Sequence, residues 1–219
     1  MLRSLFACVL VACAHVEPAA AVDIQLTDRQ VKLSGAVNDS SIEKAVQQML
    51  TLDGQSAEPI WLLIDSPGGS VDAGLILIDV MKTIRSPVYA IVTCKAYSMG
   101  AIITVFAKKR YIFPHGTMMF HEASYGALGE DPQIRSRIEF STKYLDKLHD
   151  EIAQAIGMPV DNYRKRIRDA WWVTADEAVK AGFVEAKVTG LRLSELPEEQ
   201  VEVKRTRTFK SRTMTRKTE

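Results

Sequence analysis

A chain of 219 residues, with 47% apolar and 25% charged residues, has the composition of a soluble globular protein built around one main domain. Its formal net charge of +1 gives no overall electrostatic reason to bind nucleic acid or another polyanion. Two of its three cysteines lie within the first 20 residues, which excludes a disulfide framework or a cysteine-based metal site in the body of the chain. We expect neither a metal nor a cofactor, and we expect Cys94 to be a buried thiol on a strand.

The first 21 residues have the pattern of an export signal. Arg3 precedes an apolar run over residues 5–16, and Ala19-Ala20-Ala21 offers a small-residue cleavage site. The run of about 12 residues is too short to span a bilayer, which needs about 20. Leu10-Val11-Ala12-Cys13 also resembles a bacterial lipoprotein box, in which Cys13 would carry a lipid anchor. We therefore predict an exported, periplasmic protein and leave signal cleavage and membrane attachment at Cys13 as alternatives.

Strand and helix patterns alternate along residues 22–190, which we predict to form the folded domain. Residues 24–33 alternate as a strand or a hairpin, and Ser40 with Glu43 forms a capping box that starts a helix. The segments that follow are strands at 60–64 and 88–93, helices at 71–85 and 98–106, short strands at 110–113 and 118–120, a long amphipathic helix at 134–156, helices ending near 168 and 181, and a strand at 184–188. This alternation predicts an α/β fold with a mostly parallel sheet. We expect residues 191–219 to be a basic, disordered tail.

Ser98 is the candidate nucleophile. It follows a buried strand and opens a helix, whose N-terminus brings partial positive charge and free N–H groups. The N–H of Met99 would be one donor to an oxyanion, and Gly68 and Gly69, in the turn after the neighbouring strand, offer a second because glycine lets the backbone approach a ligand closely. A serine at a helix start is more often a cap, and Pro-Gly-Gly is more often a simple turn, so neither feature is decisive alone.

His121 is the candidate general base. It ends the apolar strand at 118–120, at the carboxyl edge of the sheet where sites of α/β proteins collect. Of the other histidines, His15 lies in the leader, His115 in a turn, and His149 on the long helix, where we expect a surface position. A lone histidine at a strand end is unremarkable, but together with Ser98 and two glycines it favours acyl transfer.

Four segments, in the same order, resemble the Clp protease proteolytic subunit (ClpP) family. Residues 64–74 (IDSPGGSVDAG) are similar to its glycine motif, 96–101 (AYSMGA) to its nucleophile segment, 110–121 to its histidine strand, and 174–184 to its C-terminal motif. The resemblance covers about residues 31–188. It implies a ClpP/crotonase-like fold of stacked ββα units with a mostly parallel sheet and a protruding long helix. It also implies a ring-shaped homo-oligomer that takes peptide or unfolded protein substrates.

The resemblance also implies roles for individual residues: Ser98 as nucleophile, His121 as base, and Gly68, Gly69 and Met99 around the oxyanion. The third member of a Ser-His-Asp triad is expected at Asp169. Counted back from Ala175 without a gap, the position of the family's catalytic aspartate falls on Ala170. A one-residue insertion at Trp171-Trp172 would move that position to Asp169. Asp161 and Glu122 are the alternatives, because a carboxylate is needed to orient the histidine.

We predict an exported serine endopeptidase that works through this triad without an obvious ATPase partner, because an exported copy would meet no ATP. Three alternatives stay open. The first is a catalytically inactive ClpP-like scaffold or binding protein, which the misfit at Ala170 favours. The second is a Ser-Lys dyad peptidase that uses Lys143 or Lys147. The third is a crotonase-type acyl-CoA enzyme, which would not require Ser98 and His121 together.

Overall fold

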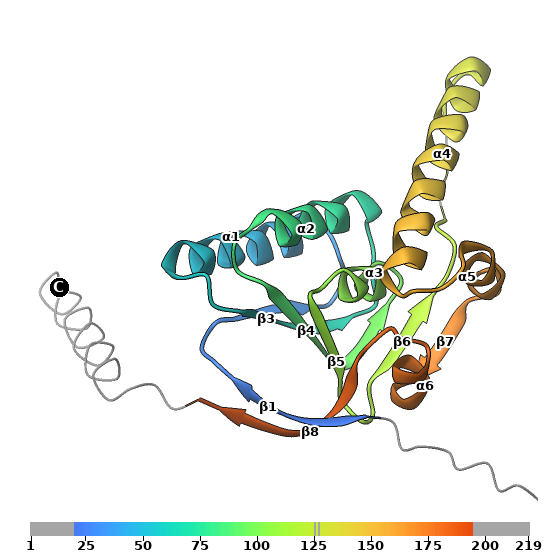
Figure 1. The fold of residues 1–219 in the computed structure, drawn as a ribbon. Helices are drawn as coiled ribbons and strands as arrows, with labels where there is room; N and C mark the ends of the chain where they lie inside the picture. The colour runs from blue at the N-terminus through green and yellow to red at the C-terminus, as the bar shows by residue number, and fades with distance from the viewer. Residues whose placement is uncertain (1–19, 125, 127, 195–219) are drawn as a thin grey trace, which may run out of the picture.

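The structure is a computed structural model that describes residues 20–124, 126 and 128–194 (Figure 1). Its elements, in chain order, are β1 (Ala21–Leu26), β2 (Gln30–Ser34), α1 (Asp39–Gln55), β3 (Ile60–Ser66), α2 (Val71–Thr83), β4 (Val88–Tyr97), α3 (Met99–Val105), β5 (Lys109–Ile112), β6 (Thr117–Phe120), α4 (Asp131–Ala155), α5 (Val160–Ile167), β7 (Trp171–Thr174), α6 (Ala175–Lys180) and β8 (Ala186–Leu193). Helices α1 and α2 lie side by side over the sheet, while α4 projects away from the body (Figure 1).

One eight-stranded sheet organises the described residues. Its order is β1-β8-β5-β4-β3-β2, with β6 paired to β4 and β7 paired to β6. The β6–β7 pair is antiparallel and the other pairs are parallel. This confirms the predicted α/β fold with a mostly parallel sheet and a protruding long helix.

Strand β4 has two neighbours on the same edge. Its first half, from Tyr89 to Val92, pairs with β5, and its last residues, from Lys95 to Tyr97, pair with β6. Strand β3 follows the opposite edge of β4 as far as the pair of Ser66 with Ala96. The carboxyl ends of β3, β4 and β6 therefore meet at one edge of the sheet, where polar residues after each strand come together.

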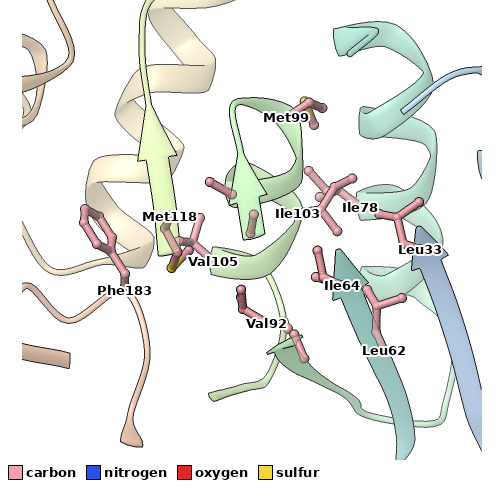
Figure 2. Close-up of a cluster of buried hydrophobic side chains, with 14 of the residues drawn as sticks. Leu33, Leu62, Ile64, Ile78, Val92, Met99, Ile103, Val105, Met118 and Phe183 are labelled. Atoms are coloured by element: carbon pink, nitrogen blue, oxygen red, sulfur yellow. The ribbon is translucent and has the colours of Figure 1, made fainter. Parts of the chain in front are cut away.

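The main core fills the space between the sheet and the helices. Labelled members in Figure 2 are Leu33, Leu62, Ile64, Ile78, Val92, Met99, Ile103, Val105, Met118 and Phe183. A second, smaller apolar cluster lies elsewhere on the sheet and is made of Ile24, Leu26, Trp61, Ile91 and Val188. Because the central strands are covered on both faces, residues 60–64 form an unbroken apolar run instead of an alternating one.

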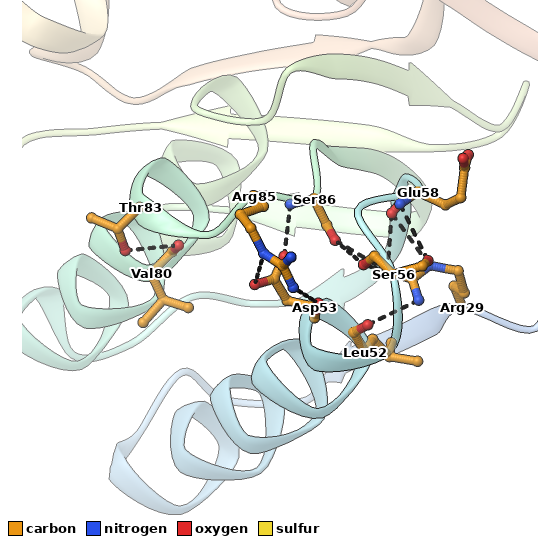
Figure 3. A network of polar contacts seen from close by, with 9 residues as sticks. All are labelled: Arg29, Leu52, Asp53, Ser56, Glu58, Val80, Thr83, Arg85 and Ser86. Carbon is orange, nitrogen blue, oxygen red and sulfur yellow. Dashed lines mark hydrogen bonds and ion pairs between the residues drawn. The ribbon is translucent and has the colours of Figure 1, made fainter.

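Arg29 ties the loop before β2 to the end of α1 (Figure 3). Its side chain is 8% exposed and donates to the carbonyls of Leu52 at 2.9 Å, Ser56 at 3.0 Å and Glu58 at 3.0 Å. It also donates to Ser86 Oγ at 3.1 Å. The carbonyl of Leu52 also accepts the N–H of Ser56, and the carbonyl of Ser56 also accepts the hydroxyl of Ser86. The buried guanidinium therefore joins the end of α1, the residues that follow it and Ser86 in one network, in which its own charge is matched by several acceptors.

Several expectations need correction. Strands β1 and β2 do not form a hairpin, because β1 pairs with β8 and β2 pairs with β3. Strand β7 was not predicted. The expectation of a buried thiol at Cys94 is wrong, since Cys94 is exposed; it lies on β4 between the stretch that pairs with β5 and the stretch that pairs with β6.

Strands β1 and β8 lie at the two predicted boundaries of the folded domain. Strand β1 starts at Ala21 and β8 runs to Leu193, and the two pair from Ala21 with Lys187 to Leu26 with Leu193. The expected export signal, apart from its last two residues, and the expected tail beyond Ser194 lie outside the described residues. Within residues 20–124, 126 and 128–194, no helix is both long enough and apolar enough to cross a membrane.

Candidate active site

Ser98 lies between the last residue of β4 and the first residue of α3, in a strained conformation. Its φ of 51° and ψ of −121° fall where residues other than glycine are rare, at a cost of about 1–3 kcal/mol. The hydroxyl makes no capping bond to α3, so the helix-cap interpretation is wrong. It lies instead 2.8 Å from Nε2 of His121. The sharp turn thus directs Oγ away from the helix and toward the imidazole.

The backbone of Ser98 is held to the strand that carries the histidine. Its N–H donates to the carbonyl of Met119 at 2.7 Å, which continues the pairing of Tyr97 with Met119 between β4 and β6. His121 follows Met119 by two residues and therefore lies on the same side of the chain. The hydroxyl and the imidazole are positioned by one pair of strands.

The glycine loop after β3 packs directly against Ser98. Gly68 has a φ of 89°, and a Cβ on it would lie 2.8 Å from Ser98 Cβ and 2.5 Å from the carbonyl oxygen of Tyr97. The buried Ser66 holds this loop, because its Oγ accepts the N–H of Gly68 at 3.1 Å and donates to the carbonyl of Gly35 at 2.6 Å. Only glycine allows this approach.

Two backbone N–H groups beside Ser98 have no acceptor among the described residues. Val37 bonds the carbonyl of Gly68 and the N–H of Ser70, each at 2.9 Å, which leaves the N–H of Gly69 on the side away from Val37. The N–H of Met99, at the start of α3, is also free. Gly68 differs, because its N–H is already bonded to Ser66. Gly69 and Met99 therefore offer two donors to a developing negative charge.

The chain is similar to known proteins of one family. The family model of the Clp protease matches residues 18–190. The ATP-dependent Clp protease proteolytic subunit of Leuconostoc citreum (strain KM20) is 36% identical over 169 residues, covering 75% of this chain and 84% of the relative.

The chain belongs to the Clp protease family. It is accordingly a serine-type peptidase, and its curled, mostly parallel sheet is consistent with the ClpP fold. This confirms the resemblance inferred from the four ordered segments.

Asp169, expected as the third member of the triad in this Clp family chain, makes no hydrogen bond or ion pair in the described structure. Its side chain is exposed just after α5. The antiparallel register pairs Phe120 with Trp171, so the next pair along the ladder would be His121 with Ala170. Ala170 has a positive φ of 62° and carries no carboxylate. No described carboxylate is bonded to His121.

Within the described residues, none of the alternative acids and bases is bonded to Ser98 or His121, whose contact is with each other. Glu122 is exposed, and Asp161 is exposed on the first turn of α5. Lys143 is 74% exposed and 2.7 Å from Glu139, and Lys147 is 80% exposed and 4.0 Å from Glu151. Both lysines form (i, i+4) pairs along α4, which is the arrangement of a solvated helix face.

The expected surface position of His149 is wrong, and Lys95 is a second titratable group with a shifted pKa. His149 is half-buried against Tyr163, with ring centroids 5.8 Å apart, and its Nδ1 is buried without a partner in the described structure. Burial, with a smaller contribution from Arg164, lowers the pKa of His149. On β4, Lys95 forms a 2.8 Å ion pair with Asp65, and this bond raises the pKa of Lys95.

Sequence reasoning missed Tyr97 and Trp172, whose rings meet edge to face with centroids 5.0 Å apart. Tyr97 precedes Ser98, and its hydroxyl is 2.8 Å from Thr117 Oγ1. Alternation along β7 was the available signal, but a strand of four residues is too short to show it clearly. Among the described residues, no group of histidine, cysteine, aspartate or glutamate side chains is arranged to hold a metal ion.

Proposed function

We propose that the chain is a serine endopeptidase in which Ser98 is the nucleophile and His121 the general base. The observation that carries this proposal is the 2.8 Å contact between Ser98 Oγ and His121 Nε2. As Oγ bonds to the scissile carbonyl carbon, its proton passes to Nε2. The imidazolium then gives this proton to the leaving amine nitrogen, and water repeats the cycle to release the acyl group.

The N–H groups of Gly69 and Met99 are proposed to bind the oxyanion of the tetrahedral intermediate. Both are free in the described structure and flank Ser98, one after β3 and one at the start of α3. A single donor of this kind contributes about 2.7–4 kcal/mol to transition-state stabilisation. Gly68 is proposed to act differently, by letting the loop approach Ser98 without a side chain in the way.

We assign no described carboxylate to Nδ1 of His121. In serine peptidases the carboxylate holds the correct tautomer, and its removal costs about 10⁴ in rate. A Ser-His pair without it still has a base and an oxyanion site. We therefore propose that the chain, with the site as described, is a slow peptidase.

A second candidate, a scaffold or binding protein without catalysis, is favoured by this same lack of a partner at Nδ1. A fluorophosphonate probe separates the two candidates, because it reacts only with an activated serine. We expect covalent labelling of Ser98, lost in Ser98→Ala and slowed at least about 100-fold in His121→Ala. A folded sample whose Ser98 is not labelled would favour the scaffold.

We propose that the chain forms a ring-shaped homo-oligomer, as members of the Clp protease family do. Large apolar side chains on the protruding part of α4 support this. Ile138 is 44%, Phe140 67% and Tyr144 39% exposed, which is unusual for a face that has no partner. Light scattering after gel filtration tests the assembly, with Phe140→Ser expected to reduce the mass and Leu193→Ser as an exposed control.

Export, and work without an ATPase partner, are proposed from residues 1–21 alone. Mass spectrometry of the protein recovered from cell fractions distinguishes cleavage after Ala21, lipid at Cys13 and an intact N-terminus. Degradation of unfolded casein without nucleotide tests whether the peptidase works without an ATPase partner. Recovery of the intact chain in the cytosol, or activity only with an ATPase, would contradict these proposals.

A further inference from the structure

One face of the small β4–β6–β7 part of the sheet is apolar yet open. Strand alternation places Tyr97, Met119 and Trp172 together on it, because Tyr97 pairs with Met119 and Met119 pairs with Trp172. We call these three residues the aromatic shelf. The opposite face carries Ala96, Met118 and Val173, which are 0%, 0% and 4% exposed. Trp172 on the shelf is 58% exposed.

The aromatic shelf is continuous with the Ser98–His121 pair. Tyr97 is the residue before Ser98, and its ring contacts Trp172 with centroids 5.0 Å apart. Met119 accepts the N–H of Ser98 through its carbonyl. His121 lies two residues beyond Met119, about 7 Å further along an extended chain and on the same side of it. The shelf therefore begins at the residue before the nucleophile, where a peptide bound at Ser98 would extend over it.

The topology decides which part of the peptide reaches the shelf. Ala96 of β4 pairs with Ser66 of β3 on one side and with Met118 of β6 on the other. Gly69, a proposed oxyanion donor, follows β3, whereas His121 follows β6. The oxyanion is thus drawn toward the β3 side, while the leaving nitrogen must approach Nε2 of His121 on the β6 side.

We infer that the aromatic shelf binds the side chain of the residue that follows the scissile bond and selects aromatic or large apolar side chains there. This inference rests on the proposed function of Ser98 and His121. An aromatic ring on the substrate can meet Trp172 in the same edge-to-face geometry that Tyr97 already uses. Trp172 is also an exposed tryptophan whose ring contacts the residue before the nucleophile, and tryptophan is among the side chains that contribute most when they are covered on binding.

Internally quenched peptides that differ only at the residue after the cleaved bond test the inference. We expect peptides with Phe or Leu there to be cut with a kcat/KM about 10-fold above those with Ala or Asp, a usual discrimination for one apolar contact. Trp172→Ala should reduce this ratio to about 2-fold or less, and Trp172→Phe should keep most of it. Leu50→Ala, an exposed apolar change on α1, is the matched control and should leave the ratio as in the wild type.

The outcomes separate the shelf from the chemistry. If wild-type Ser98 is not labelled by the fluorophosphonate, the proposed function fails. If Ser98 is labelled but Trp172→Ala keeps the wild-type ratio, the shelf alone is refuted. Loss of the assembly in Trp172→Ala would also overturn the inference, since the shelf would then be a face between copies of the chain.

Discussion

Phe120 of β6 pairs with Trp171 of β7 in an antiparallel ladder, and this register places Ala170, the residue just before β7, opposite His121, the residue just after β6. Ala170 holds a φ of 62°, a conformation that suits aspartate or asparagine better than alanine. The ladder thus leads to a position beside the base where a short acidic side chain would fit the backbone.

We predict that Ala170→Asp raises the rate of fluorophosphonate labelling of Ser98 by about 10-fold or more. A carboxylate beside the imidazole holds its tautomer and stabilises imidazolium, and the full effect in a complete triad is about 10⁴. Ala170→Asn is the control for relief of backbone strain, and Asp169→Ala should change the rate by about 2-fold or less. An equal gain in the asparagine variant would attribute the effect to the backbone, and a large loss in Asp169→Ala would restore Asp169 as the acid.

Gly68→Ala should abolish labelling of Ser98, with a loss of about 100-fold or more. The new Cβ would meet Ser98 Cβ at 2.8 Å and the carbonyl of Tyr97 at 2.5 Å, so the turn that presents the hydroxyl has to move. Gly157→Ala is the matched control, because Gly157 also has a positive φ, 66°, but nothing lies within 4 Å of its Cβ position. That variant should lose about 1–2 kcal/mol of stability and label normally; equal labelling in both would show that the approach of Gly68 is dispensable.

Arg29→Ala should lower the free energy of unfolding by about 2–4 kcal/mol, because three carbonyls and Ser86 Oγ lose a charged donor in a buried setting. Arg85→Ala is the control at a surface arginine. Its side chain is 65% exposed and 3.5 Å from Asp53, a pair that contributes no more than about 1 kcal/mol. Urea denaturation followed by fluorescence measures both, and similar losses would show that burial of Arg29 does not matter.

Acid should weaken the packing of α4 on α5 through His149. Burial holds the pKa of His149 below its ordinary value of 6.5, so the neutral form is preferred in the folded state. The stability contributed by neutral His149 is present above about pH 6.5 and is lost as pH falls through the lower folded pKa. Arg164 adds to this lowering, while Glu122, Asp146 and Asp150 oppose it.

Thermal unfolding between pH 7 and pH 5 measures this effect. We expect His149→Phe to lose less stability over this range than the wild type, because it removes both the titrating group and a buried nitrogen without a partner. His115→Gln, in an exposed turn, should behave as the wild type. An unchanged acid response in His149→Phe would assign the pH dependence to other groups.

The sequence was sufficient for the features that depend on local chemistry. Buried strands appear as continuous apolar runs, and Ser98 and the glycine loop each follow such a run, so their meeting at one sheet edge could be predicted. His121 was found for the same reason, since it directly follows the short strand β6, in which Met118, Met119 and Phe120 are apolar.

What the sequence did not reveal depends on partners that are distant in the chain. Strand β7 is four residues long between two helices, and only its pairing with β6 defines it. Whether Gly68 or Gly69 has a free N–H depends on a bond from Ser66 Oγ. The exposure of Cys94 depends on a change of neighbours along β4, and the apolar pattern of α4 does not tell a core face from a face open to another molecule.

The bond from Ser98 N–H to the carbonyl of Met119 makes catalysis depend on how β6 is aligned with β4. Side chains alternate along a strand, so a displacement of β6 by one residue would present Phe120 or Glu122 where His121 stands. No smaller displacement keeps the hydrogen bonds between these strands. The alignment of β6 with β4 is therefore either kept or lost, and the contact between Ser98 Oγ and His121 Nε2 is kept or lost with it.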